Sequence, residues 1–152
     1  EYLRGLCQQN KLADGGFDLL GHHLELGDID VPICAVGCET DHIAPWKDSY
    51  RGVQQMGSKD KTFIMTQSGH IAGIVNPPSK GKYGHYTNPD MSLNHKDWLE
   101  GAEFHKGSWW PRWGKWLANH AGTQVDARIP GANGQEIICD APGTYVTRKA
   151  NS

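Results

Sequence analysis

The chain has 152 residues, a formal net charge of −2, 38% hydrophobic residues and 21% charged residues. This size fits one ordinary domain, and the modest charge content differs from that of a disordered chain. The sequence has no basic segment interleaved with aromatic residues, which argues against a nucleic-acid partner because phosphate binding requires clustered Lys and Arg. No apolar stretch approaches the roughly 20 residues of a membrane-spanning helix, so no transmembrane segment is expected.

The amino-terminal segment predicts a short helix followed by extended pieces. Residues 1–12 carry apolar side chains at helical spacing, and Asp14-Gly15-Gly16 is typical of a helix end. Residues 17–30 have a mixed apolar pattern that indicates short extended segments. The chain opens on Glu1, with neither a Met nor the apolar run of a signal peptide, so we expect it to belong to a longer protein.

The next segment predicts a strand, a helix and a second strand. Residues 31–37 form a continuous apolar run, which is typical of a strand buried on both faces of a parallel sheet. Pro45 suits the first turn of a helix that extends to Met56, and residues 62–66 form another apolar strand. Short links between these elements predict a right-handed βαβ crossover in an α/β protein.

The second half of the chain predicts a looser structure. Residues 79–97 are polar and predict a long surface loop. Residues 98–120 contain a cluster of Trp residues at helical spacing, with Ser108 as the expected N-cap, and this pattern favours packing over a substrate channel. We expect residues 1–78 to form a βαβ core, and residues 79–152 to form a loop-rich tail that packs on it.

The cysteine pattern argues against a metal site. The four cysteines are Cys7, Cys34, Cys38 and Cys139. No C-x2-C or H-x3-H pair supplies the further ligands that zinc requires. The sequence therefore predicts reduced, mostly buried thiols, with the cytoplasm as the expected compartment and no metal or cofactor.

Asp41 and His70 are the candidate catalytic residues. Asp41 follows the first predicted strand and His70 follows the second, and chemistry in α/β sheets gathers at the carboxyl ends of strands. A carboxylate beside an imidazole is the acid–base part of a nucleophile-His-Asp triad, in which the imidazole takes a proton from Ser or Cys. The alternative is a helix-capping Asp and a surface His.

The sequence does not contain the expected nucleophile. A nucleophile elbow has the form G-x-S-x-G or G-x-C-x-G, and no Ser or Cys of this chain has Gly at both positions. In α/β-hydrolase folds the nucleophile also precedes the acid in the chain. We therefore expect the nucleophile to lie outside this chain.

Several motifs resemble the carboxyl-terminal catalytic region of poly(3-hydroxyalkanoate) synthases, most closely the class I type. The resemblance is carried by segments spread over nearly the whole chain: Tyr2-Leu3-Arg4, Asn10-Lys11-Leu12, Asp41-His42-Ile43-Ala44-Pro45-Trp46, Ser68-Gly69-His70-Ile71-Ala72-Gly73-Ile74-Val75-Asn76-Pro77-Pro78, Gly107-Ser108-Trp109-Trp110-Pro111 and Ala141-Pro142-Gly143-Thr144-Tyr145-Val146. It implies the carboxyl-terminal portion of an α/β-hydrolase fold.

This resemblance also implies a function. Such enzymes are acyltransferases that polymerise (R)-3-hydroxyacyl-CoA into polyester on intracellular granules, with release of CoA and with a Cys nucleophile. By motif, Asp41 matches the catalytic aspartate and His70 the catalytic histidine. His42 also belongs to the motif and is expected either to support the acid loop or the pocket, or to act only as a capping or loop-bracing histidine. The implied partners are the acyl-CoA substrate, the growing polyester and the granule surface, with a homodimer as a candidate assembly. We expect the chain alone to be inactive.

Two other functions remain open on the sequence. The first is a part of a serine hydrolase of the same fold, such as an esterase or depolymerase, which an upstream Ser elbow would indicate. The second is a non-catalytic module for subunit or granule contact. Whether Asp41 acts through His70 or directly on the substrate hydroxyl also remains open.

Overall fold

The computed structural model describes residues 1–129, 131–132 and 134–150. The chain forms two compact units, residues 1–120 and residues 121–152. The strands of the first unit are β1 (Phe17–Leu19), β2 (His22–Leu24), β3 (Ile33–Cys38), β4 (Lys61–Thr66), β5 (His85–Thr87) and β6 (Glu103–His105). Its helices are α1 (Trp46–Gln55), α2 (His95–Glu100) and α3 (Trp110–His120), with short helical turns η1 (Leu3–Gln8), η2 (Leu26–Asp28) and η3 (Pro78–Lys80).

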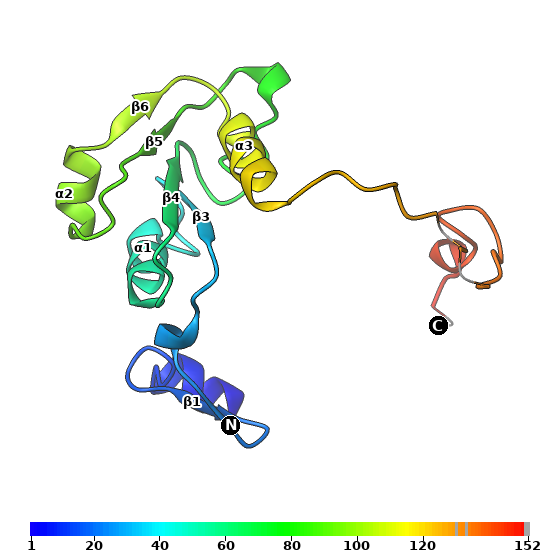
Figure 1. Ribbon diagram of the computed structural model, residues 1–152, viewed down its shortest axis with the longest axis horizontal. Coiled ribbons are helices and arrows are strands. Elements are labelled where there is room, and N and C mark those ends of the chain that lie inside the picture. The colour runs from blue at the N-terminus through cyan, green and yellow to red at the C-terminus, as the bar shows by residue number, and fades with distance from the viewer. Residues whose placement is uncertain (130, 133, 151–152) are drawn as a thin grey trace. The chain divides into compact units, whose positions relative to one another are not determined.

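The main sheet has four strands in the order β3-β4-β5-β6 (Figure 1). β3 and β4 are parallel and in register from Ile33 opposite Lys61 to Cys38 opposite Thr66. Helix α1 connects them, which confirms the predicted βαβ crossover. β5 and β6 add antiparallel pairings, so the sheet is mixed, and the expectation of parallel strands holds only for the first pair.

The core on one face of the sheet is aromatic. Trp46, Tyr50, Phe63 and Trp98 are almost fully buried, and they join α1 and α2 to β4. The Tyr50 and Phe63 rings meet edge to face, with centroids 5.2 Å apart and an interplanar angle of 86°. Gly37 completes the packing, because a Cβ there would lie 2.9 Å from both Phe63 and Trp46. The buried aromatic side chains of α1 therefore fix the helix on the sheet.

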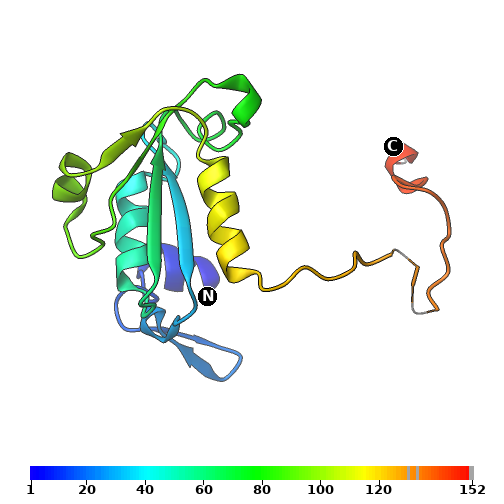
Figure 2. The ribbon, with the colours of Figure 1, turned by 45° about the horizontal axis from the view of Figure 1, so that its top comes forward.

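Helix α3 lies on the opposite side of the β3–β4 pair from α1 (Figure 2). The Ser108 hydroxyl oxygen accepts the backbone N–H of Trp110 at 3.1 Å, as expected for the predicted N-cap. At the other end of the helix, His120 Nε2 lies 3.1 Å from an Asp60 carboxylate oxygen. The contact between His120 and Asp60 holds the end of α3 close to the beginning of β4.

Residues 79–97 differ from the predicted long loop, because they contain β5 and the start of α2. The Asn94 side chain accepts the backbone N–H groups of Lys96 and Asp97, which begins α2. At the amino terminus, the predicted helix is limited to the π-helical turn η1, and β1 and β2 form a hairpin. The second unit has one short helical turn, η4 (Tyr145–Thr147), among its described residues.

No helix of the described residues is long and apolar enough to span a membrane.

Candidate active site

Asp41 and His70 meet in the loops that follow the carboxyl ends of β3 and β4. His70 Nδ1 lies 2.8 Å from Asp41 Oδ2, which is the distance of a charge-assisted hydrogen bond. The parallel register places Cys38 opposite Thr66, so the two strands end side by side and the loops that follow them converge. The pair predicted from the topology is therefore in direct contact.

The Asp41 carboxylate is held by its own loop. Its Oδ1 accepts the backbone N–H groups of Ile43 at 2.8 Å and Ala44 at 2.9 Å, while Oδ2 faces His70. The hydrogen bond from Ala44, with further bonds from His70 and Ile43, lowers the Asp41 pKa from 3.8 to about 2 against the opposing effect of burial. The side chain is only 6% exposed, so Asp41 is a sequestered carboxylate that remains ionised near neutral pH.

The loops that carry Asp41 and His70 are joined by backbone hydrogen bonds beyond the strands. Glu39 N–H donates to the Thr66 carbonyl at 2.8 Å, and Thr40 N–H donates to the Ser68 carbonyl at 3.1 Å. Ser68 has a φ of 78°, in the left-handed region that turns the chain sharply before His70.

The imidazole of His70 has one nitrogen engaged and one available. Nδ1 faces the carboxylate, so the neutral ring carries its proton there and presents the Nε2 lone pair. Nε2 makes no hydrogen bond to the described residues, and the side chain is 48% exposed. The arrangement suits a base that receives a proton from a group outside these residues.

His42 and the cysteines lie outside this contact. His42 is exposed, and within the described residues its imidazole makes no hydrogen bond. Cys38 is 2% exposed, and burial followed by the charge of Asp41 raises the pKa of its thiol. A buried thiol with a raised pKa is a poor nucleophile. Of the other cysteines, Cys7 and Cys139 are exposed and Cys34 is half-buried.

Two Trp side chains at the start of α3 hold the loop that follows His70. The indole N–H of Trp109 donates to the Gly73 carbonyl at 3.0 Å, and that of Trp110 donates to the Ile74 carbonyl at 2.9 Å. The sequence predicts these aromatics as packing residues, and the hydrogen bonds add a second role. No pattern in the sequence indicates that these indole N–H groups bind the loop after His70, because the bonded residues are 36 positions apart.

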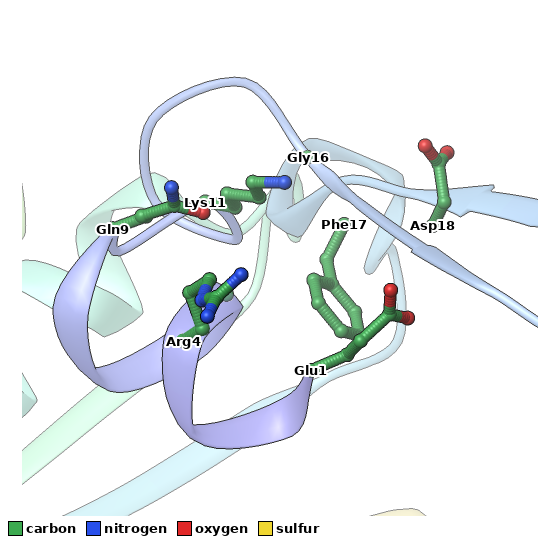
Figure 3. Close-up of a pocket in the computed structure, with 8 residues that line it drawn as sticks. Glu1, Arg4, Gln9, Lys11, Gly16, Phe17 and Asp18 are labelled. Atoms are coloured by element: carbon green, nitrogen blue, oxygen red, sulfur yellow. The ribbon is translucent and has the colours of Figure 1, made fainter.

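A separate pocket lies between η1 and β1 (Figure 3). It has a volume of about 280 Å³ and is lined by residues that include Arg4, Lys11, Phe17 and Asp18. None of the predicted site residues lines it. Among the described residues, no group of three or more His, Cys, Asp and Glu side chains is placed to hold a metal ion.

The fold and the site define a mixed α/β protein with a hydrogen-bonded Asp–His pair at the ends of adjacent parallel strands. No family model matches the sequence. The chain is 40% identical to the poly(3-hydroxyalkanoate) polymerase subunit PhaC of Rhizobium etli over 97% of its own length and 23% of that protein. It is 41% identical to PhaC of Cupriavidus necator over 98% of the chain and 26% of that protein. The poly(3-hydroxyalkanoate) polymerase of Methylorubrum extorquens is also 41% identical, over 98% of the chain and 25% of that protein.

The chain belongs to the poly(3-hydroxyalkanoate) polymerase family and matches the carboxyl-terminal part of its members. It spans about a quarter of the length of these relatives, 23% to 26%.

Proposed function

We propose that this chain supplies the acid–base residues of a poly(3-hydroxyalkanoate) polymerase whose Cys nucleophile lies elsewhere in the protein. The substrate is an (R)-3-hydroxyacyl-CoA, and the product is a polyester with release of CoA. The observation that carries the proposal is the 2.8 Å contact between Asp41 and His70 at the ends of two parallel strands. The names of the relatives support a polymerase rather than a hydrolase.

In the first step, His70 Nε2 removes the proton of the cysteine thiol. The thiolate attacks the thioester carbonyl, an acyl–cysteine bond forms, and the bond between the acyl group and CoA breaks. The CoA thiolate takes the proton from the imidazolium and leaves. In the elongation step, His70 removes the proton of a 3-hydroxyl group, whose oxygen attacks a cysteine-bound acyl group to form an ester, and the cysteine leaves as a thiolate that regains the proton.

Asp41 acts through His70 in this proposal. A general base is most effective when its pKa lies near the working pH, and the Asp41 pKa of about 2 makes its carboxylate a weak proton acceptor. The same carboxylate is well placed to hold the Nδ1 proton and to stabilise the imidazolium that forms. The hydrogen bonds that weaken Asp41 as a base therefore strengthen it as an orienting anion.

The same proposal also covers the fold and the cellular location of the full-length polymerase. The β3–β4 pair belongs to the larger sheet of an α/β-hydrolase fold, with the nucleophile on an elbow upstream of the acid. The enzyme works in the cytoplasm at the surface of polyester granules, and it requires no metal or cofactor. The 152-residue chain alone does not release CoA, because the activated thiol is supplied from outside it.

The test is CoA release from 3-hydroxybutyryl-CoA by the intact polymerase that contains this region. His70→Ala removes the base, and we expect a loss of at least about 10³-fold in kcat. The matched control is His120→Ala, which also breaks a His–Asp contact but at the opposite end of β4. Turnover by His70→Ala within about tenfold of the parent enzyme would overturn the proposal.

A further inference from the structure

The turn that bears His70 depends on the position of the Gly73 peptide. Gly73 N–H donates to the Gly69 carbonyl at 2.9 Å, which closes a turn around His70. Gly73 is itself buried, and a Cβ there would lie 2.8 Å from the Cys38 sulfur and 3.0 Å from the carbonyl oxygens of Gln67 and Gly69. The loop therefore has a fixed contact with β3 on one side.

On the other side, the Gly73 carbonyl is held by the indole N–H of Trp109 at 3.0 Å. Thr66 Oγ1 lies 3.3 Å from the same oxygen and 3.3 Å from the Gln67 carbonyl, so its single proton is shared between two acceptors. Trp109 is only 7% exposed. Without the indole N–H, the Gly73 carbonyl keeps only the longer contact with Thr66 Oγ1, whose proton is shared with the Gln67 carbonyl. A buried carbonyl cannot recover the lost bond from bulk water, so the loop is expected to shift.

The neighbouring Trp110 differs in this respect. Its indole N–H donates to the Ile74 carbonyl at 2.9 Å, but its side chain is 36% exposed. Water can replace an exposed donor at little cost. Trp109 is therefore the member of the pair whose hydrogen bond the loop cannot replace.

We infer that Trp109 is a positioning residue for His70, acting through its indole N–H on the Gly73 carbonyl. The linkage runs from α3 through Gly73 and the turn that Gly73 closes to His70, and from there to Asp41. This inference rests on the proposed function for its effect on turnover, whereas its effect on the geometry of His70 can be measured independently.

The test uses Trp109→Phe in the intact polymerase, because Phe keeps an aromatic ring and removes the N–H donor. The matched control is Trp116→Phe on the same helix. The Trp116 indole N–H is buried and has no hydrogen-bond partner in the described part of the chain. Loss of ring volume is the same in both variants, so only Trp109→Phe removes a bond to the histidine loop.

Two measurements are made on each variant. One is kcat and KM for CoA release from 3-hydroxybutyryl-CoA, and the other is the Nδ1–H resonance of His70 in protein labelled with ¹⁵N-histidine, assigned by its loss in His70→Ala. A misplacement near 1 Å costs up to about 100-fold in rate. We expect Trp109→Phe to lower kcat by at least about tenfold with little change in KM. Trp109→Phe should also weaken the Nδ1–H resonance of His70, because a misplaced Nδ1 proton exchanges faster with water. Trp116→Phe should change neither kcat nor this resonance.

Retention of both kcat and the His70 resonance in Trp109→Phe would overturn the inference. Equal losses in Trp116→Phe would also overturn it, because ring volume would then be the cause. If Trp109→Phe does not fold, replacement of Trp109 by 3-benzothienylalanine removes the N–H donor and keeps the bicyclic ring, and an intact His70 resonance in that variant counts against the inference. Full turnover by His70→Ala overturns the proposed function instead, and the resonance alone then decides the positioning role.

Discussion

Replacement of Asp41 by Asn separates the shape of the acid loop from its charge. Oδ1 of Asp41 accepts two backbone N–H groups, from Ile43 at 2.8 Å and Ala44 at 2.9 Å. Only an oxygen accepts such bonds, so in Asp41→Asn the amide oxygen takes this place and the NH2 group faces His70 Nδ1, where Oδ2 now lies at 2.8 Å. An NH2 group only donates, so the neutral imidazole must carry its proton on Nε2. That nitrogen can then no longer act as the base.

This change of tautomer determines how much kcat should fall in Asp41→Asn. The same substitution in a Ser-His-Asp protease leaves the geometry intact and lowers kcat about 10⁴-fold. At about 1.36 kcal/mol per factor of ten, this loss corresponds to about 5 kcal/mol of transition-state stabilisation. We expect a decrease of about 10³- to 10⁴-fold for Asp41→Asn in the intact polymerase.

The assay measures CoA release from 3-hydroxybutyryl-CoA, first as a single turnover for acylation and then in the steady state for elongation. Asp60→Asn is the control, because Asp60 also pairs with a histidine, His120 Nε2 at 3.1 Å, but away from the site. If Asp41 acts through His70, both phases of Asp41→Asn are slow. A decrease in kcat of less than about tenfold would show that Asp41 does not fix the tautomer of His70. A loss of elongation with normal acylation would show that Asp41 acts directly on the substrate hydroxyl.

Three further predictions concern stability. Burial, with the charges of His105 and Arg112, lowers the His85 pKa below its ordinary 6.5, so the unfolded state binds a proton more readily than the folded state. The unfolding free energy should therefore fall as the pH drops from about 8 to about 5.5. In denaturant titrations at several pH values, His85→Gln should make the unfolding free energy depend less on pH. An unchanged pH dependence would show that His85 is not the group responsible. Asn94→Ala removes the cap of α2 and should lower the unfolding free energy by about 1 kcal/mol, measured by urea titration. An unchanged unfolding free energy would show that the cap does not stabilise the protein. Gly73→Ala places a Cβ 2.8 Å from the Cys38 sulfur and should cost about 1–3 kcal/mol in the same titration, whereas a stability equal to the parent would show that the loop can yield.

The parts of the fold that follow from local patterns were predictable from the sequence. The apolar run before Asp41 and the helical spacing of Trp46, Tyr50 and Val53 specify a buried strand and the helix that covers it. Because parallel strands end at the same edge of a sheet, the contact between Asp41 and His70 followed from topology.

The antiparallel half of the sheet was not predictable in the same way. β5 and β6 have three residues each, and they contain His, Thr and Glu rather than an apolar run. β5 pairs with β4 across a long connection, and β6 pairs with β5, so pairing rather than local propensity sets their strand conformation. The bond from Trp109 to Gly73 joins residues 36 positions apart, so periodicity indicates a packed aromatic face but not the carbonyl that it holds.

We propose that the Asp41–His70 pair activates a cysteine thiol supplied by the rest of the polymerase. The most direct measurement is the mass of the intact enzyme after rapid quenching with one equivalent of 3-hydroxybutyryl-CoA. We expect the parent enzyme and His120→Ala to gain the mass of one hydroxybutyryl group on a cysteine within a single turnover, and His70→Ala to gain none on that timescale. Acylation of His70→Ala at the rate of the parent enzyme would show that His70 is not the base that activates the cysteine.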